Sequence, residues 1–188
     1  MLPIEIMKSF FEKVVFTIFL TAFFGSNSQS AEGYRFIVGE NGTVLDKKFN
    51  VVWKRCALGQ QYKNSKCVGS AKKIDMAMET GSLFKRYGYK VDEWRLPTAT
   101  ELASLVECTS GEKSTLSYGE GGQCLGEFMA PTTNTALFPD TPTDAAFWSS
   151  TICGGFSLAT NFTDGWSGCY TLNDGPQYVR LVKGSENE

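Results

Sequence analysis

The chain has 188 residues, of which 42% are apolar and 20% are charged, and its formal net charge is −2. This length predicts one domain, and the near-neutral charge excludes a strongly basic nucleic-acid-binding protein. The sequence contains no histidine, which excludes Ser-His-Asp and Cys-His catalysis, imidazole acid–base chemistry and zinc sites built on histidine.

The first 31 residues have the layout of a secretory signal peptide. Lys8 and Lys13 precede the apolar run 14–24, and small and polar residues follow as far as Ala31. A membrane anchor is the alternative, but a spanning helix needs about 20 apolar residues. We therefore expect export of residues 32–188 as one domain, without stable membrane insertion after signal removal, to the periplasm, cell surface or medium.

The first half of the exported part predicts strands followed by a helix. Residues 34–38 are rich in β-formers, and 43–46 and 51–54 read as a hairpin around a polar connection. Apolar residues spaced by three and four predict a helix over 71–87, which Ser70 can cap and Gly88 can end.

The second half predicts another helix, a long loop region and further strands. Thr98 and Glu101 form a T-x-x-E capping box, which predicts a short helix that ends near residue 108. The Gly-, Ser-, Thr- and Pro-rich region 109–143 is too long to be a mere connector. The remaining segments read as strands separated by turns at Asp164-Gly165 and 173–176: 147–151, 156–162 and 177–182. This order predicts an α+β fold with two helices packed on small antiparallel sheets.

Six cysteines lie in the exported part, an even number that indicates disulfides in an oxidising compartment. They are Cys56, Cys67, Cys108, Cys124, Cys153 and Cys169. Of 15 possible connectivities we favour the sequential pairs, because each closes a local loop. A zinc site lacks C-x2-C spacing, and a catalytic thiol would leave an odd cysteine.

Charge is distributed unevenly along the chain. Residues 47–95 contain twelve Lys or Arg and four acids, whereas residues 96–188 contain three bases and eleven acids. Such asymmetry fits a molecule with one basic and one acidic face. The alternative is that the two segments interleave in the fold and neutralise each other.

Several blocks in order resemble an exported bacterial family, that of the C-terminal domain of the Legionella collagen-like adhesin. These blocks are Gly42–Asp46, Val52–Cys56, Leu58–Gln60, Cys67–Gly69, Trp94–Thr98 with Glu101-Leu102, Phe147–Thr151, Asp164-Gly165 and Tyr178–Gly184. The resemblance implies a C-type-lectin-like fold with long disulfide-stapled loops, related to that of the formylglycine-generating enzyme. It also implies an exported adhesin, since the named adhesin binds sulphated glycans.

We interpret most residues of these shared blocks as scaffold. They are Trp53, Trp94, Arg95, Pro97, Glu101, Trp148 and Arg180. Large aromatic residues at strand positions are more often core than ligand platforms. The two arginines are expected to pair with carboxylates such as Asp46, Glu93 or Glu101, because a guanidinium fork suits a bidentate carboxylate.

Two kinds of side chain are candidates for glycan binding. Basic residues, which suit sulphate groups, are Lys47, Lys48, Arg55, Lys72 and Lys73, and the alternative is an ordinary solvated face. Trp166 and Tyr170 lie in Gly-rich segments and are candidates for stacking on a sugar. For Trp166 the alternative is that it covers the 153–169 bridge.

Calcium is the one cofactor that the sequence suggests. Asp164, Asn173 and Asp174 lie in loop-like positions, and hard oxygen ligands suit calcium. The alternative is that these residues form turns. Otherwise no cofactor is expected.

These observations favour a non-catalytic binding or adhesion module that recognises a surface glycan, either sulphated or neutral, or a partner protein. The alternatives are a structural component of a cell-envelope or pilus-like system and an enzyme derived from the formylglycine-generating fold. No nucleic-acid partner is expected, and the sequence leaves the oligomeric state open.

Overall fold

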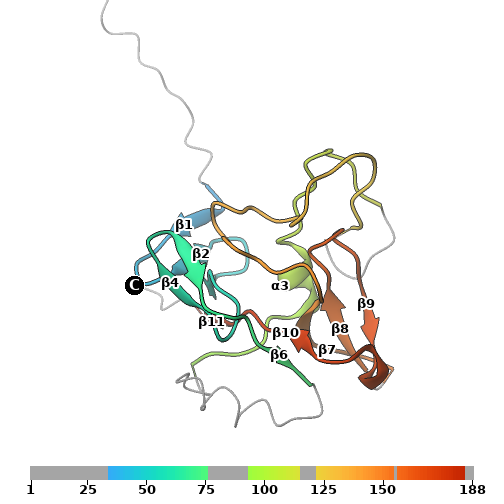
Figure 1. Ribbon diagram of the computed structural model, residues 1–188. Helices are drawn as coiled ribbons and strands as arrows, with labels where there is room; N and C mark the ends of the chain where they lie inside the picture. Colours follow the sequence, from blue (N-terminus) through green and yellow to red (C-terminus); the bar gives the residue numbers. More distant parts are fainter. Residues whose placement is uncertain (1–33, 76–92, 115–121, 155, 185–188) are drawn as a thin grey trace, which may run out of the picture. The chain divides into compact units, whose positions relative to one another are not determined.

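The computed structural model describes residues 34–75, 93–114, 122–154 and 156–184. The chain divides into two units, Met1–Tyr34 and Arg35–Glu188, and the fold described below is that of the second (Figure 1). The predicted signal peptide lies outside the described residues. Within the part of the chain that is described, no helix has the length and apolar character needed to cross a membrane.

The first sheet has four antiparallel strands in the order β1-β2-β3-β11. They are β1 (Phe36–Val38), β2 (Thr43–Asp46), β3 (Val51–Lys54) and β11 (Val182–Gly184). The predicted hairpin of 43–46 with 51–54 is thus confirmed. Val44, Trp53 and Val182 lie in register across three strands, and all three are fully buried. Alternation along each strand places these side chains on the core face of the sheet.

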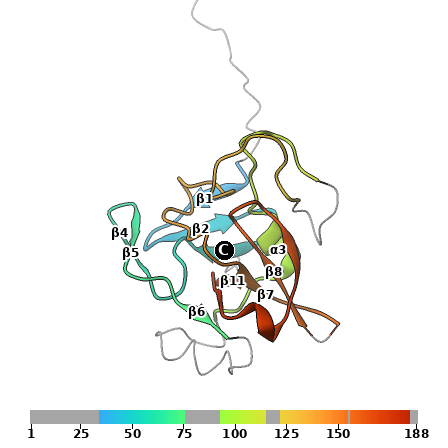
Figure 2. The same ribbon diagram turned by 45° about the vertical axis from the view of Figure 1, so that its right-hand side comes forward.

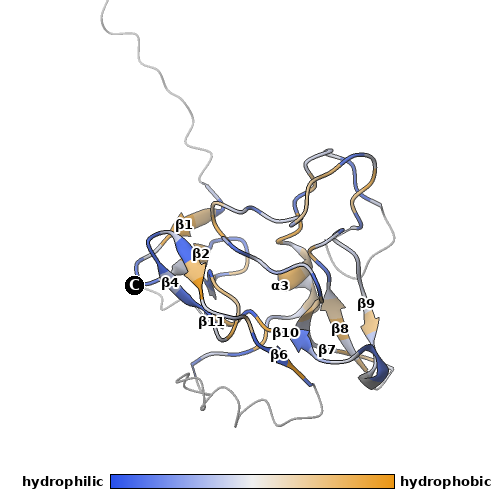
Figure 3. Cartoon of the chain, in the orientation of Figure 1, coloured by the Kyte–Doolittle hydropathy of each residue, from blue (hydrophilic) through white to orange (hydrophobic). Residues whose placement is uncertain are grey.

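The second sheet has five strands in the order β6-β10-β7-β8-β9, antiparallel except for the β10–β7 pair. They are β6 (Lys73–Ile74), β7 (Phe147–Cys153), β8 (Phe156–Thr160), β9 (Ser167–Tyr170) and β10 (Gln177–Tyr178). A 3-10 turn, Leu172–Asp174, follows β9. Strand β10 lies between β6 and β7 and yet is coloured hydrophilic in Figure 3. Its polar residue Gln177 lines the cleft described below.

A separate hairpin joins β4 (Gln61–Lys63) and β5 (Lys66–Val68). Its turn residues Asn64 and Ser65 both have positive φ, at 49° and 63°. Two positive φ angles are typical of the turn whose twist matches that of a hairpin.

Helix α3 (Ala99–Ala103) begins with the predicted capping box. The Glu101 amide donates to Thr98 Oγ1 at 3.2 Å, and the Thr98 amide donates to Glu101 Oε2 at 2.7 Å. Glu101 also accepts two hydrogen bonds from the Arg95 guanidinium, at 2.7 and 2.8 Å. The helix lies beside β7 and β8 in both Figure 1 and Figure 2, where its fully buried Leu102 joins the apolar core.

The expected fold class, α+β of C-type-lectin-like type with two helices packed on small antiparallel sheets, is wrong. The described residues form three sheets and one short α-helix. The predicted helix over 71–87 fails at its start, where Lys73–Ile74 is strand β6, and its remainder from residue 76 lies outside the described residues. Pairing with β10 and a hydrogen bond from Trp148 Nε1 to the Ile74 carbonyl, at 2.8 Å, outweigh the helical periodicity there.

The predicted strand over 177–182 is also corrected, because the chain there passes from one sheet to the other. Tyr178 pairs within the second sheet and Val182 within the first. Between them, the Val179 and Leu181 carbonyls accept hydrogen bonds from the amides of Leu58 and Lys54. This crossing links the two sheets through one continuous segment.

All six cysteines form disulfides: Cys56–Cys67, Cys108–Cys124 and Cys153–Cys169. These are the sequential pairs that the spacing favoured. Cys108–Cys124 spans part of the irregular segment after α3, where Lys113 and Cys124 also form an isolated β-bridge. Cys56–Cys67 ties the segment after β3 to β5, and Cys153–Cys169 ties β7 to β9.

Candidate functional site

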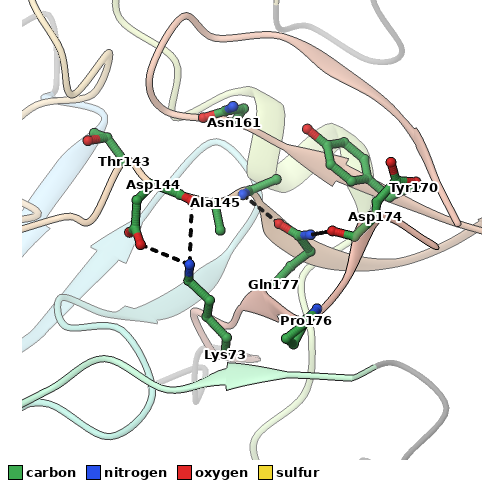
Figure 4. Close-up of a pocket in the computed structure, with 10 residues that line it drawn as sticks. Lys73, Thr143, Asp144, Ala145, Asn161, Tyr170, Asp174, Pro176 and Gln177 are labelled. Atoms are coloured by element: carbon green, nitrogen blue, oxygen red, sulfur yellow. Dashed lines mark hydrogen bonds and ion pairs between the residues drawn. The ribbon is translucent and has the colours of Figure 1, made fainter. Parts of the chain in front are cut away.

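An open cleft of about 480 Å³ lies where β6 and β10 meet the segment before β7 and the end of β9. Ten described residues line it: Lys73, Thr143, Asp144, Ala145, Ala146, Asn161, Tyr170, Asp174, Pro176 and Gln177. Figure 4 shows the Lys73–Asp144 pair on one side of the cleft and Tyr170 with Asp174 on the other. The volume of the cleft falls within the range of about 300–1,000 Å³ that is usual for small-molecule sites.

An ion pair forms one wall of the cleft. Lys73 Nζ lies 2.8 Å from Asp144 Oδ2, and the Tyr178 hydroxyl donates to Asp144 Oδ1 at 2.7 Å. These two hydrogen bonds hold the pKa of Asp144 below its ordinary value. Burial and the Asp144 carboxylate raise the pKa of Tyr178 to about 12. The carboxylate is still 67% exposed, so it is fixed in position yet open to a ligand.

Gln177 fixes the floor of the cleft. Its buried side chain accepts a hydrogen bond from the Ala146 amide at 2.7 Å and donates to the Asp174 and Gly175 carbonyls at 2.9 and 3.0 Å. Asp174 Oδ2 accepts from the amide and the hydroxyl of Thr171 at 2.6 and 2.9 Å, which lowers the Asp174 pKa. The rim carboxylate is thus ionised and anchored by its own turn.

Tyr170 forms the opposite wall, in the middle of a row of three aromatic rings. Its ring meets that of buried Trp148 edge to face at 6.2 Å, and the Trp166 ring at 5.6 Å. Burial, followed by the charges of Asp164 and Asp174, raises the pKa of Tyr170. The phenol therefore stays protonated and lies in a negative local field.

Gly168 makes room for this row on strand β9. A Cβ at Gly168 would collide with the six-membered ring of Trp166. Residues 168 and 170 share one face of the strand, and the Trp166 ring, which comes just before the strand, occupies the space over Gly168. The indole is 38% exposed and extends the aromatic surface beyond the cleft.

The predicted ligand-binding residues are only partly brought together. Lys73 and Tyr170 line the cleft, and Trp166 lies beside Tyr170. Lys47 and Lys48 are exposed in the turn between β2 and β3, and Lys72 is exposed next to Gly59.

Arg55 does not belong to a solvated basic face, because it is buried. Its guanidinium donates to the Leu137 carbonyl at 2.7 Å, to the Ala136 carbonyl and to the Tyr62 hydroxyl. Hydrogen bonds to backbone carbonyls thus compensate the buried guanidinium charge, and Arg55 anchors an irregular segment to the first sheet.

The residues proposed as calcium ligands make hydrogen bonds within their turns. Asp164 accepts from the Trp166 amide and from Gln123 Nε2, both at 3.0 Å, and the Asn173 amide donates to Thr171 Oγ1 at 3.1 Å. Among the described residues, no group of three or more acidic residues or cysteines is placed to hold a metal ion. Calcium binding stays a prediction.

The residues interpreted as scaffold occupy structural positions in the described fold. Trp53, Trp94 and Trp148 are buried. The Pro97 carbonyl accepts a hydrogen bond from the Ser150 amide at 2.8 Å. Arg95 forms an ion pair with Glu101, which is one of the carboxylate partners predicted for it.

Arg180 differs from its prediction, because it bonds to no carboxylate among the described residues. Its guanidinium donates to Thr141 Oγ1 at 2.8 Å and to the Arg55 carbonyl, and it lies 4.8 Å from the ring centre of Phe138 and 5.4 Å from that of Phe147. Burial lowers the pKa of Arg180 to about 9, so it remains charged at pH 7. Carbonyl dipoles and aromatic faces therefore replace the expected carboxylate.

Sequence reasoning missed Asn161 and Gln177 as site residues, and it did not bring Asp144 together with Lys73. Asn161 appears in the sequence only as part of an Asn-Phe-Thr triplet, and Gln177 only as the residue after a turn. No short-range spacing links them to Lys73, which lies 71 residues before Asp144 in the chain.

One of three comparisons with known proteins gave a match. The family model described as the Lcl C-terminal domain matches residues 42–183. Comparison with curated protein sequences and comparison with solved structures each gave no match. The matched region runs from just before β2 into β11, so it includes β2, β3, the whole second sheet and the cleft, while β1 precedes it. The chain belongs to the Lcl C-terminal domain family.

Proposed function

We propose that this domain is an exported adhesion module that binds a surface glycan in the cleft between Lys73–Asp144 and Tyr170. The observation that carries the proposal is the combination of an aromatic wall with fixed polar groups around one open cleft. Membership of the Lcl C-terminal domain family indicates an adhesin-like module, and three disulfides fit an extracellular location.

The chemistry of the lining suits a sugar. A pyranose ring has apolar C–H faces and a rim of hydroxyls, so it needs a flat aromatic surface and several hydrogen-bonding partners. Tyr170 offers the surface, and the side chains of Asn161, Asp144 and Asp174 offer the partners.

The site is held in place before a ligand arrives. Gln177 bonds to three backbone groups, and Asp144 bonds to Lys73 and Tyr178. Preorganised groups lose little conformational entropy on binding, which favours affinity from a small contact area. Trp166 continues the aromatic surface along β9, so a second sugar unit can stack outside the cleft.

The proposal is tested by binding of the exported, oxidised chain to a panel of polysaccharides, across a salt series and with or without EDTA. We expect Tyr170→Ala to abolish binding and the double variant Lys47→Ala, Lys48→Ala to retain it. The double variant serves as a matched control on exposed residues outside the cleft. The reverse pattern, together with strong salt dependence, would place the glycan on the exposed lysines instead.

The second candidate is a structural component of the cell envelope without glycan affinity. Absence of binding to every polysaccharide would favour it over the glycan proposal. An enzyme that uses a free thiol has no support, since all six cysteines are in disulfides. We propose no catalytic step for this domain.

A further inference from the structure

We propose that the cleft selects an uncharged sugar over a sulphated one, an inference that rests on the proposed function. The charges around the cleft lead to it. Of the ten described residues that line the cleft, three are charged: Lys73, Asp144 and Asp174. One cation and two carboxylates leave the lining with a net negative charge.

The single lysine of the lining is already paired with a carboxylate. Lys73 Nζ lies 2.8 Å from Asp144 Oδ2, 3.4 Å from the Asp144 carbonyl oxygen and 5.2 Å from the ring centre of Tyr178. A sulphate that competed for this ammonium would have to approach Asp144, whose carboxylate is the more exposed partner. The ion pair thus presents its anion to the solvent.

The opposite wall is negative as well. Asp174 is exposed at the rim, and its hydrogen bonds to Thr171 keep it ionised. Asp164 lies in the turn before β9, where the Trp166 amide and Gln123 Nε2 donate hydrogen bonds to it. Burial, followed by the charges of these two carboxylates, raises the pKa of the Tyr170 phenol. A sulphate stacked on this wall would therefore lie near two charges of its own sign.

The balance of donors and acceptors points the same way. The two carboxylates of the lining accept hydrogen bonds and cannot donate them. A sugar hydroxyl can donate to a carboxylate, whereas a sulphate ester has only acceptor oxygens. The hydroxyls of a neutral ligand can therefore donate to both carboxylates of the lining. A sulphate group would place acceptor oxygens and a negative charge next to the same two carboxylates, which disfavours its binding.

The test compares dextran, galactan and mannan, each with its chemically sulphated form, by calorimetry on the exported, oxidised chain. We expect at least one neutral polymer to bind at least about tenfold more tightly than its sulphated form at low salt. This binding should be unchanged at 0.5 M salt and lost in Tyr170→Ala. Asp174→Asn should raise the affinity for the sulphated form several-fold, and Glu107→Gln, the same change on an exposed carboxylate outside the cleft, should not.

The outcomes separate the two proposals. Sulphated polymer that binds as tightly as the neutral one, and that Tyr170→Ala abolishes, overturns the inference and leaves the proposed function intact. Binding of no polymer at all overturns the proposed function and the inference with it. An affinity for sulphated polymer that is equal in Asp174→Asn and Glu107→Gln also overturns the inference, because the rim carboxylate then plays no part in selection.

Discussion

The carboxylate of Glu101 joins the start of α3 to Arg95, so Glu101→Gln tests how much this junction stabilises the fold. In the wild type, one carboxylate accepts hydrogen bonds from the Thr98 amide and from two nitrogens of Arg95. Glutamine has one acceptor oxygen and presents an NH₂ group where the second oxygen was. With its oxygen in the place of Glu101 Oε2, glutamine keeps the hydrogen bonds from the Thr98 amide and from Arg95 Nη1. It loses the hydrogen bond from Arg95 Nη2 and sets its NH₂ group against that nitrogen.

The expected cost follows from these contacts. Glutamine also serves at the third position of a capping box, so the cap at Thr98 persists. The Arg95 side chain is 46% exposed, so loss of the ion pair costs only about 0.5 kcal/mol after solvent screening, and the lost hydrogen bond from Arg95 Nη2 costs about 0.5 kcal/mol more. We therefore expect Glu101→Gln to lower the free energy of unfolding by about 1 kcal/mol, which moves the urea midpoint by roughly 0.5 M.

The assay is urea unfolding of the oxidised chain at pH 7, with Glu107→Gln as the matched control. Glu107 is exposed, so its substitution should change stability by less than about 0.5 kcal/mol. A midpoint shift no larger than that of the control would refute the assignment of Glu101 as the junction. A cycle with Arg95→Met then isolates the coupling between the two side chains.

The same carboxylate gives the stability a pH dependence. Although burial alone would raise it, hydrogen bonds from Arg95 and Thr98 hold the pKa of Glu101 below its ordinary value of 4.5. A depressed carboxylate pKa contributes stability that is present above the unfolded-state pKa and is lost as the pH falls through the folded-state pKa. The difference between wild type and Glu101→Gln should therefore be full at pH 6 and should shrink below pH 4.5.

Three further predictions follow from the structure. Replacing Cys56 and Cys67 with serine opens an 11-residue loop and should cost about 3 kcal/mol by the chain-entropy relation, measured as the shift in the urea midpoint. Gly168→Ala should displace the Trp166 indole, which would change the tryptophan emission and weaken glycan binding while the fold persists; unchanged emission would contradict the contact. Tyr178 should ionise only near pH 12, so the absorbance titrations of wild type and Tyr178→Phe should coincide below about pH 11.

Local sequence determined the features whose partners lie close together in the chain. The hairpin of β2 and β3, the capping box of Thr98 and Glu101 and the three sequential disulfides all join residues separated by short loops. Turn residues behave in the same way, since Gly165 and Gly175 have φ angles of 82° and 73° at the predicted turns. Short loops cost little entropy to close, so short-range preference and final structure agree.

Tertiary structure alone decided the rest. Ile74 lies in a helical pattern, yet its backbone pairs with Gln177, which is distant in the chain. The cleft brings Lys73 to Asp144 and Asn161 to Tyr170 and Gln177, and Arg180 finds backbone carbonyls in place of the expected carboxylate. Periodicity and composition record only what a residue's near neighbours require, whereas these contacts depend on which distant segments the two sheets bring together.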